Sequence, residues 1–188
     1  IILILDCDHV PAQDILKNTL GWFFKDEKLA LVQTPHFFIN PDPVEKSLGS
    51  FRRAPSENEM FYRGIQPAID LWNATFFCGS AALLRREFVK EMGGLVGETI
   101  VEDCESSINM HAKGYRSVYI GRPMVCGLSP ETFEDFLVQR SRWCQGMLQL
   151  AFLNNPTFKR GLSFGQRVCY SSFYMYWFFG FARCIFFV

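Results

Sequence analysis

Two aspartates near the start of the chain, Asp6 and Asp8, have the type and spacing of a metal-binding pair. They directly follow the aliphatic run at residues 1–5, which is typical of a buried strand of a parallel sheet. Residues i and i+2 of an extended chain point to the same side, and ligands bind at the C-terminal edge of parallel sheets. Such close carboxylates repel each other unless a cation joins them, and Mg²⁺ is commonly held by one or two carboxylates. We therefore predict a divalent-cation site at Asp6 and Asp8, with His9 as a nitrogen ligand suited to Mn²⁺.

The same stretch allows two other interpretations. An Asp-x-Asp after a strand is often turn chemistry, and Pro11 with Asp14 is typical of the entry to a helix, expected over residues 12–24. An apolar strand followed by Asp-x-Asp-x-Val also resembles the nucleophile motif of haloacid-dehalogenase-type phosphatases. In that case Asp6 would attack phosphorus and Asp8 would act as acid and base. A short motif alone does not decide between these classes.

A second acidic pair, Glu102 and Asp103, precedes a helical pattern at residues 102–114. Carboxylates in the first turn of a helix commonly cap it or interact with its dipole. A carboxylate there can also act as a general base, provided that it reaches the hydroxyl whose proton it takes. Asp103 is the candidate for that role.

The segment QRSRW at residues 139–143 brings Gln139, Arg142 and Trp143 to positions i, i+3 and i+4 of an expected helix. These positions share one helix face. A guanidinium suits pyrophosphate oxygens, and an indole suits the flat face of a sugar. The alternative is a core tryptophan accompanied by a surface arginine.

Two loop segments carry further candidates. In FFCGS at residues 76–80, Gly79 permits close approach of the backbone to a ligand, and Cys78 precedes it; the alternative is a strand entry with a buried cysteine. His36 follows the expected strand 29–33, so it would emerge at the same sheet edge as Asp6 and Asp8. A single histidine is more often a loop hydrogen-bonding residue than a ligand.

The expected elements alternate along the chain. We predict strands at 1–5, 29–33, 81–85 and 117–121, and helices at 12–24, 56–73, 102–114 and 131–152. This alternation indicates an α/β fold with a mainly parallel sheet. We expect one domain over residues 1–162 and an aromatic tail over residues 163–188.

Composition excludes several classes. The chain has 188 residues, 49% of them hydrophobic and 20% charged, which excludes a disordered protein. The formal net charge is zero, so no global field favours nucleic acid, and no nucleic-acid partner is expected. The seven cysteines are scattered without zinc spacing, which indicates reduced thiols. The chain begins without Met in what looks like a central strand, so we expect a fragment of a longer polypeptide.

The tail has no charge from residue 168 to residue 182 and is crowded with aromatic residues. As a helix this stretch would span about 22 Å, which is less than the roughly 30 Å of a bilayer core. Tyrosine and tryptophan favour headgroup depth, so we expect an amphipathic helix in the membrane interface. A buried core helix, or a span completed beyond residue 188, are the alternatives.

Taken in order, the motifs resemble those of the processive family-two inverting glycosyltransferases, and within that family the cellulose-synthesising members. They are the Asp6-Cys-Asp8 triplet, QTPHFF at 33–38, FFCGS at 76–80, the pair at 102–103 and QRSRW at 139–143. The resemblance covers nearly the whole chain. It implies an incomplete GT-A-type fold with a mainly parallel sheet flanked by helices, a UDP-glucose donor, Mg²⁺ (with Mn²⁺ as the alternative) and growth of a β-1,4-glucan at its non-reducing end with inversion.

The resemblance also implies roles for individual residues. Asp103 would be the catalytic base, and Asp8, Asp6 and His9 would hold the metal. The donor side would consist of Asp6, Asp8, Arg142 and Gln139. The acceptor side would consist of Trp143, Cys78, Gly79, Glu102 and His36.

Two departures from the family pattern matter. Val101 replaces a threonine before the acidic pair, which leaves the fine positioning of Asp103 open. The family's upstream uridine-binding region, transmembrane helices, gating loop and cyclic-di-GMP-binding domain are not in this chain. The resemblance implies an inner (plasma) membrane location with the catalytic domain facing the cytoplasm, and a periplasmic accessory subunit and cyclic-di-GMP as partners of regions outside this chain.

Some alternatives stay open at this point. Chitin, hyaluronan, curdlan or alginate synthases share the same motifs, because the motifs determine the chemistry better than the sugar. A phosphatase that uses Asp6, or a non-catalytic membrane-associated scaffold, is a more distant interpretation.

Overall fold

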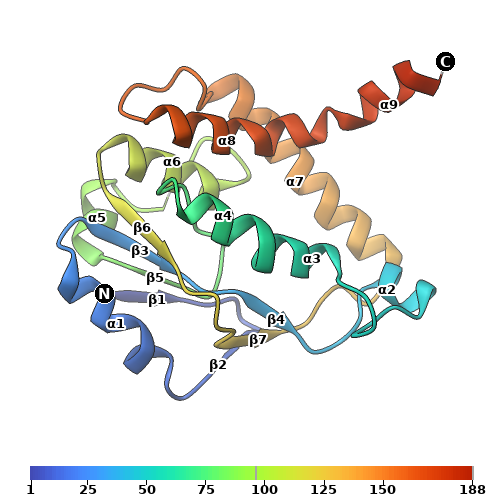
Figure 1. Ribbon diagram of the computed structural model, residues 1–188, viewed down its shortest axis with the longest axis horizontal. Helices are drawn as coiled ribbons and strands as arrows, with labels where there is room; N and C mark the ends of the chain where they lie inside the picture. Colours follow the sequence, from blue (N-terminus) through green and yellow to red (C-terminus); the bar gives the residue numbers. More distant parts are fainter. Residues whose placement is uncertain (96, 188) are drawn as a thin grey trace.

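The computed structural model describes residues 1–95 and 97–187 and has an α/β architecture (Figure 1). In chain order the elements are β1 (Ile2–Ile4), β2 (Val10–Pro11), α1 (Ile15–Lys25), β3 (Leu29–Gln33), β4 (His36–Phe38), α2 (Pro43–Leu48), α3 (Glu57–Met60), the π-helical turn η1 (Phe61–Ile65), α4 (Gln66–Asp70), β5 (Ala82–Leu84), α5 (Arg86–Glu91), α6 (Glu102–Ala112), β6 (Arg116–Tyr119), β7 (Val125–Gly127), α7 (Phe133–Leu153), α8 (Phe164–Trp177) and α9 (Phe179–Phe187). Helix α1 lies below the larger sheet in Figure 1, α6 and α8 lie above it, and α9 projects away from the body.

The larger sheet has the strand order β1-β5-β3-β6 and is mixed. β5 runs antiparallel to both of its neighbours, whereas β3 and β6 pair in parallel, so β1, β3 and β6 share one direction. The expectation of mainly parallel pairing therefore needs correction. The chain reaches β5 at the edge where β1 and β3 end, because Ala82 is in register with both Ile4 and Gln33. From that edge β5 can only run back in the opposite direction.

A second sheet, which sequence reasoning missed, has the order β2-β7-β4. Its strands are two or three residues long, which is too short for an alternating pattern to stand out. β4 starts at His36, whose register partner is Val125 in β7. This small sheet therefore positions His36 beside the end of β3.

The helix expected over residues 56–73 is divided into α3, η1 and α4. The π-helical turn adds one residue to a helical turn, and such insertions are frequent at functional sites. Tyr62, which lies inside the π turn, and Gln66, the first residue of α4, are both buried. Tyr119 of β6 donates a hydrogen bond to the Tyr62 carbonyl at 2.7 Å, which ties the π turn to the sheet.

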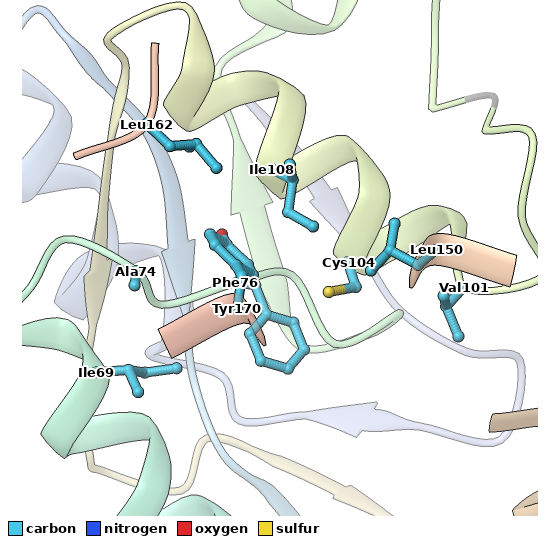
Figure 2. Packing of buried hydrophobic residues seen from close by; sticks show 9 residues of the cluster. All are labelled: Ile69, Ala74, Phe76, Val101, Cys104, Ile108, Leu150, Leu162 and Tyr170. Carbon is cyan, nitrogen blue, oxygen red and sulfur yellow. The ribbon is translucent and has the colours of Figure 1, made fainter. Parts of the chain in front are cut away.

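The main core lies between α6, α4, α7 and α8, with the ring of Tyr170 at its centre (Figure 2). The Tyr170 hydroxyl lies 2.7 Å from His111 Nδ1, and His111 Nε2 lies 2.9 Å from the Ser117 hydroxyl. Burial lowers the pKa of His111 to about 3, so the imidazole is neutral and one hydrogen bond per ring nitrogen satisfies it. This chain of contacts fastens α6 to both α8 and β6.

The aromatic tail forms two helices that meet at Phe178, where a single helix over residues 168–182 was expected. One side of α8 is buried through Gln166 and Tyr170. The other side bears exposed apolar side chains, namely Phe164, Val168, Met175 and Tyr176. Across residues 1–95 and 97–187, no helix is both long and apolar enough to cross a membrane.

The hydroxyl of Tyr170 gives a direct test of this packing. We expect Tyr170→Phe to lower the free energy of unfolding by about 1–3 kcal/mol, because it leaves a buried imidazole nitrogen without its partner. Urea unfolding followed by circular dichroism measures the change. Tyr176→Phe, at a side chain that is 56% exposed, is the matched control and should be neutral. Equal stability of both variants would contradict the role given to the Tyr170–His111 contact.

Candidate active site

The predicted metal residues lie together in a turn after β1. One ligand atom from each of Asp6, Asp8 and His9 can be chosen so that all three lie within 4.8 Å of one another. The turn, closed by a hydrogen bond from His9 N to Asp6 O at 3.0 Å, brings them together. The sequence predicted that alternation along an extended strand would bring them together. It does not, because β1 ends at Ile4, before the first aspartate. Two exposed carboxylates and an imidazole are a donor set that fits a divalent cation such as Mg²⁺ or Mn²⁺.

His9 is more deeply placed than the two aspartates and is only 9% exposed. Its Nδ1 lies 2.6 Å from the Ser80 hydroxyl and 3.9 Å from Asp6 Oδ2. The other side of the ring packs against Gly127, where a Cβ would overlap the imidazole. To coordinate a cation through Nδ1, His9 would have to release Ser80.

The FFCGS segment runs alongside this turn. The Cys78 amide donates to Gln33 Oε1 at 3.1 Å, and Gln33 Nε2 donates to the Ser80 carbonyl at 2.9 Å. Gly79 has φ +80°, and Ala81 has φ +55°, a left-handed conformation that is costly for a residue with a Cβ. A Cβ on Gly79 would lie 3.5 Å from Asp103 Oδ2, so this loop touches the predicted base.

Asp103 is the second residue of α6, and its Oδ1 accepts a hydrogen bond from Cys104 N at 2.7 Å. Burial raises the pKa of this carboxyl to about 7, and the nearby charges of Glu102 and Asp6 act in the same direction. A carboxyl that titrates near neutral pH can accept a proton and release it again, as a general base must.

His36 and Cys78 complete this cluster. His36 Nε2 donates to the Ser80 carbonyl at 3.0 Å, and burial lowers the pKa of His36 to about 4, so the ring is neutral. Burial, followed by the charge of Asp103, raises the pKa of the Cys78 thiol well above its usual range. Cys78 is therefore a neutral thiol, and Gln66 Nε2 lies 3.1 Å from its sulfur.

Sequence reasoning missed two residues of this cluster, Ser80 and Tyr62. Burial raises the pKa of Tyr62 far above its usual range, and the nearby carboxyl groups of Asp103 and Asp6 act in the same direction. Its ring also packs against His36, with 5.0 Å between ring centroids. The sequence signal for Ser80 was its position at the end of FFCGS. Tyr62 gave no signal, because an aromatic residue in a helical stretch usually indicates core packing.

The QRSRW segment lies in α7, where Trp143 is 38% exposed, Arg142 is exposed and Gln139 is partly buried. Sequence reasoning passed over Arg140. Its guanidinium carbon lies 4.5 Å from the centre of the Trp143 ring, and its Nη2 pairs with Glu57 Oε2 at 2.9 Å. This arginine therefore fixes the indole and links α7 to α3.

Helix α7 crosses the beginning of α6. Gly146 lies so close to Val101 that a Cβ there would be 2.6 Å from Val101 Cγ1. Trp143 is one turn before Gly146, and Asp103 is two residues after Val101, so the crossing brings the two motifs toward the same end of α6. Val101 itself is 7% exposed and belongs to the core cluster, which accounts for an apolar residue at this position.

The family of the chain follows from a comparison with known proteins. A model described as glycosyl transferase family group 2 matches residues 1–188. The chain belongs to this family. The cellulose synthase catalytic subunit [UDP-forming] of Pseudomonas fluorescens (strain SBW25) is 46% identical over 185 residues, and that of Xanthomonas axonopodis pv. citri (strain 306) is 43% identical over 184 residues. Each alignment covers 98% of this chain and 25% of the relative, so the chain spans about a quarter of the length of these proteins.

A solved structure supports the fold. A mannosyltransferase from Pyrobaculum calidifontis, in complex with GDP-Man and Mn²⁺, matches with a TM-score of 0.56 and 17% identity. The match covers 90% of this chain and 48% of that structure. This glycosyltransferase family member therefore has the expected GT-A-type fold. The roles of its individual site residues stay predictions.

The raised pKa of Asp103 has a consequence for stability. Its carboxyl holds a proton more tightly in the folded chain, so its contribution to stability is lost as the pH rises through about 7. Asp103→Asn removes the ionisable carboxyl and therefore this pH-dependent loss of stability. We expect the variant to gain stability relative to the native chain in EDTA-containing buffer, with a difference in unfolding temperature that grows from about pH 4 to about pH 7 and then levels off.

Thermal unfolding across this pH range measures the effect. Glu131→Gln, which changes an exposed carboxylate, is the control and should show no such dependence on pH. A constant difference between Asp103→Asn and the native chain at every pH would contradict the raised pKa.

Proposed function

We propose that this chain is the catalytic portion of a polysaccharide synthase, which transfers glucose from UDP-glucose to the non-reducing end of a β-1,4-glucan with inversion. The observation that carries the proposal is the Asp103 carboxyl, whose pKa is raised to about 7 beside the Gly79 backbone. The relatives from Pseudomonas fluorescens and Xanthomonas axonopodis are cellulose synthase catalytic subunits [UDP-forming], which supports glucose, UDP and the glucan product.

The donor side of the reaction uses the turn after β1. Asp6 and Asp8 would hold Mg²⁺ or Mn²⁺, and a cation bound there supplies positive charge that stabilises the departing nucleoside diphosphate. Arg142 is exposed on α7 and carries a guanidinium suited to the pyrophosphate, with Gln139 one turn before it. The Mn²⁺ and GDP-Man in the Pyrobaculum structure support a metal and a nucleotide sugar as ligands of this type of fold.

The acceptor side of the reaction uses Asp103 and Trp143. Asp103 accepts the proton of the attacking hydroxyl, while the Trp143 indole stacks on the sugar ring that carries it. In this proposal Cys78, Gly79, Glu102 and His36 would contact the acceptor, and Gly79 is supported by its closeness to Asp103. Positioning of this kind replaces a bimolecular encounter with a reaction inside one complex, which makes a large contribution to catalysis.

The family match leaves some of the other interpretations of the sequence open and gives no support to one of them. The family match gives no support to phosphatase chemistry at Asp6. Chitin, hyaluronan, curdlan and alginate synthesis remain alternatives for the sugar, because the motifs determine the chemistry better than the sugar.

Two site variants of the natural full-length protein test the reaction in isolated membranes. We expect Asp103→Asn to reduce polymer synthesis from UDP-glucose by about 10²- to 10⁴-fold, because the general base is lost. We expect Asp8→Asn to raise the half-saturating Mn²⁺ concentration. UDP release and alkali-insoluble glucan are measured together, with UDP-N-acetylglucosamine and GDP-mannose as competing donors and Glu131→Gln as the control.

Three outcomes would contradict the proposal. Normal glucan synthesis by Asp103→Asn would exclude this residue as the base. Polymer formed from another nucleotide sugar alone would exclude glucose. Release of phosphate from an aryl phosphate, lost in Asp6→Asn, would favour phosphatase chemistry instead.

The exposed side of α8 supports a second part of the proposal, which is that α8 and α9 lie at the cytoplasmic face of the inner membrane. Phe164, Val168, Met175 and Tyr176 form an apolar stripe along α8, and α9 bears further exposed phenylalanines and Ile185. Aromatic residues on one side of a helix favour the headgroup region of a bilayer. The buried side of the same helix holds Tyr170, so membrane contact and core packing use opposite sides.

Vesicle flotation of the 188-residue chain tests this location. We expect the chain to float with vesicles that contain anionic lipid, and Phe164→Ser/Val168→Ser/Met175→Ser to lose most of this binding. The control is Phe24→Ser, which removes a phenylalanine that is 87% exposed on α1, on the opposite side of the sheet (Figure 1). Equal flotation of the triple variant and the native chain would exclude the α8 stripe as a membrane surface.

A further inference from the structure

Ser80 ends the FFCGS segment and contacts the turn that holds Asp6 and His9. Its side chain is fully buried. Its hydroxyl oxygen accepts a hydrogen bond from Asp6 N at 2.9 Å and lies 2.6 Å from His9 Nδ1. Its carbonyl accepts hydrogen bonds from Gln33 Nε2 at 2.9 Å and from His36 Nε2 at 3.0 Å. One residue thus contacts the turn that bears the predicted metal ligands, the end of β3 and the start of β4.

The contacts of Ser80 restrict His9. The Ser80 hydroxyl oxygen accepts the Asp6 amide proton, and its other hydrogen bond is with His9 Nδ1. Nδ1 of His9 is therefore engaged by Ser80, and Nε2 faces Gly127, where a Cβ would overlap the ring.

The backbone on both sides of Ser80 is fixed as well. Gly79 and Ala81 both have left-handed φ values, and the Ala81 carbonyl accepts hydrogen bonds from the amide and hydroxyl of Thr34 at 3.0 and 2.9 Å. Gly79 approaches Asp103 so closely that a Cβ there would be 3.5 Å from Oδ2. A shift of the Ser80 hydroxyl relative to Asp103 would have to break these contacts.

We propose that Ser80 is a positioning residue: its hydroxyl, acting through the Asp6 amide and His9, holds the carboxylates of Asp6 and Asp8 in register with Asp103. This inference rests on the proposed function, because it assigns a role in the metal and donor site of that reaction. Replacing a residue that orients metal ligands through hydrogen bonds typically lowers metal affinity by about 10- to 100-fold. A residue with a purely structural role would change the unfolding temperature but not the affinity for the metal.

The chain contains a matched control for this distinction. Ser117 is also buried, and its hydroxyl lies 2.9 Å from a histidine nitrogen, His111 Nε2. That pair belongs to the core beside Tyr170 and contacts none of the predicted metal ligands. Ser80→Ala and Ser117→Ala therefore each remove one buried serine–histidine contact, and only the first should affect the metal.

The experiment measures Mn²⁺ binding to the natural full-length protein by electron paramagnetic resonance of free Mn²⁺, in the presence of UDP. We expect Ser80→Ala to raise the Mn²⁺ dissociation constant about 10-fold or more, as expected for a residue behind a metal site. Ser117→Ala should bind Mn²⁺ like the native protein while showing a similar decrease in unfolding temperature. Native-like Mn²⁺ affinity in Ser80→Ala, or equal loss of affinity in both serine variants, would overturn the proposal.

Asp8→Asn separates this inference from the proposed function. If Asp8→Asn loses Mn²⁺ binding while Ser80→Ala retains it, the inference fails and the metal site stands. If Asp8→Asn binds Mn²⁺ like the native protein, the metal site itself is wrong, and the role of Ser80 falls with it.

Discussion

Partial removal of the Asp103 carboxyl from water is the constraint on which this site depends. The burial that raises its pKa to about 7 requires α6 to stay seated against the loop at Gly79. Two buried groups hold the helix in that position. Near its start, Glu105 accepts hydrogen bonds from the amide and hydroxyl of Thr99, both at 3.0 Å. Near its end, His111 contacts Tyr170. The predicted base is therefore positioned by residues that have no role in the proposed reaction.

The aromatic residue of the QRSRW segment is supported in a comparable way. Arg140 lies between the rings of Phe136 and Trp143, with 4.7 and 4.5 Å from its guanidinium carbon to the ring centres. The ion pair with Glu57 keeps the cation in place, and attraction between a cation and an aromatic face stabilises both rings. An indole that is fixed on one side would lose little conformational freedom in the stacking contact proposed for Trp143.

Much of this arrangement could be predicted from the sequence, and the exceptions have physical reasons. The strand 29–33 and the helices at 102–114 and 131–152 were identified because apolar runs and helical periodicity report burial directly. The direction of β5 was missed, because it depends on the route of residues 74–81 and not on local pattern. The motif residues were singled out by type and order, and their roles stay predictions. Ser80 and Arg140 were not assigned roles, because their importance arises from contacts with residues distant in the sequence.

The position of β1 has a consequence for how this chain behaves in solution. β1 pairs with β5 on one side, and within residues 1–95 and 97–187 no strand pairs with its other side. That side is a row of backbone amides and carbonyls without strand partners, on a segment of three aliphatic residues. Such a row is a template for strand addition from any neighbouring molecule. Because the row is only three residues long, it offers few hydrogen bonds to a second copy of the chain, and this shortness limits edge-to-edge joining at high concentration.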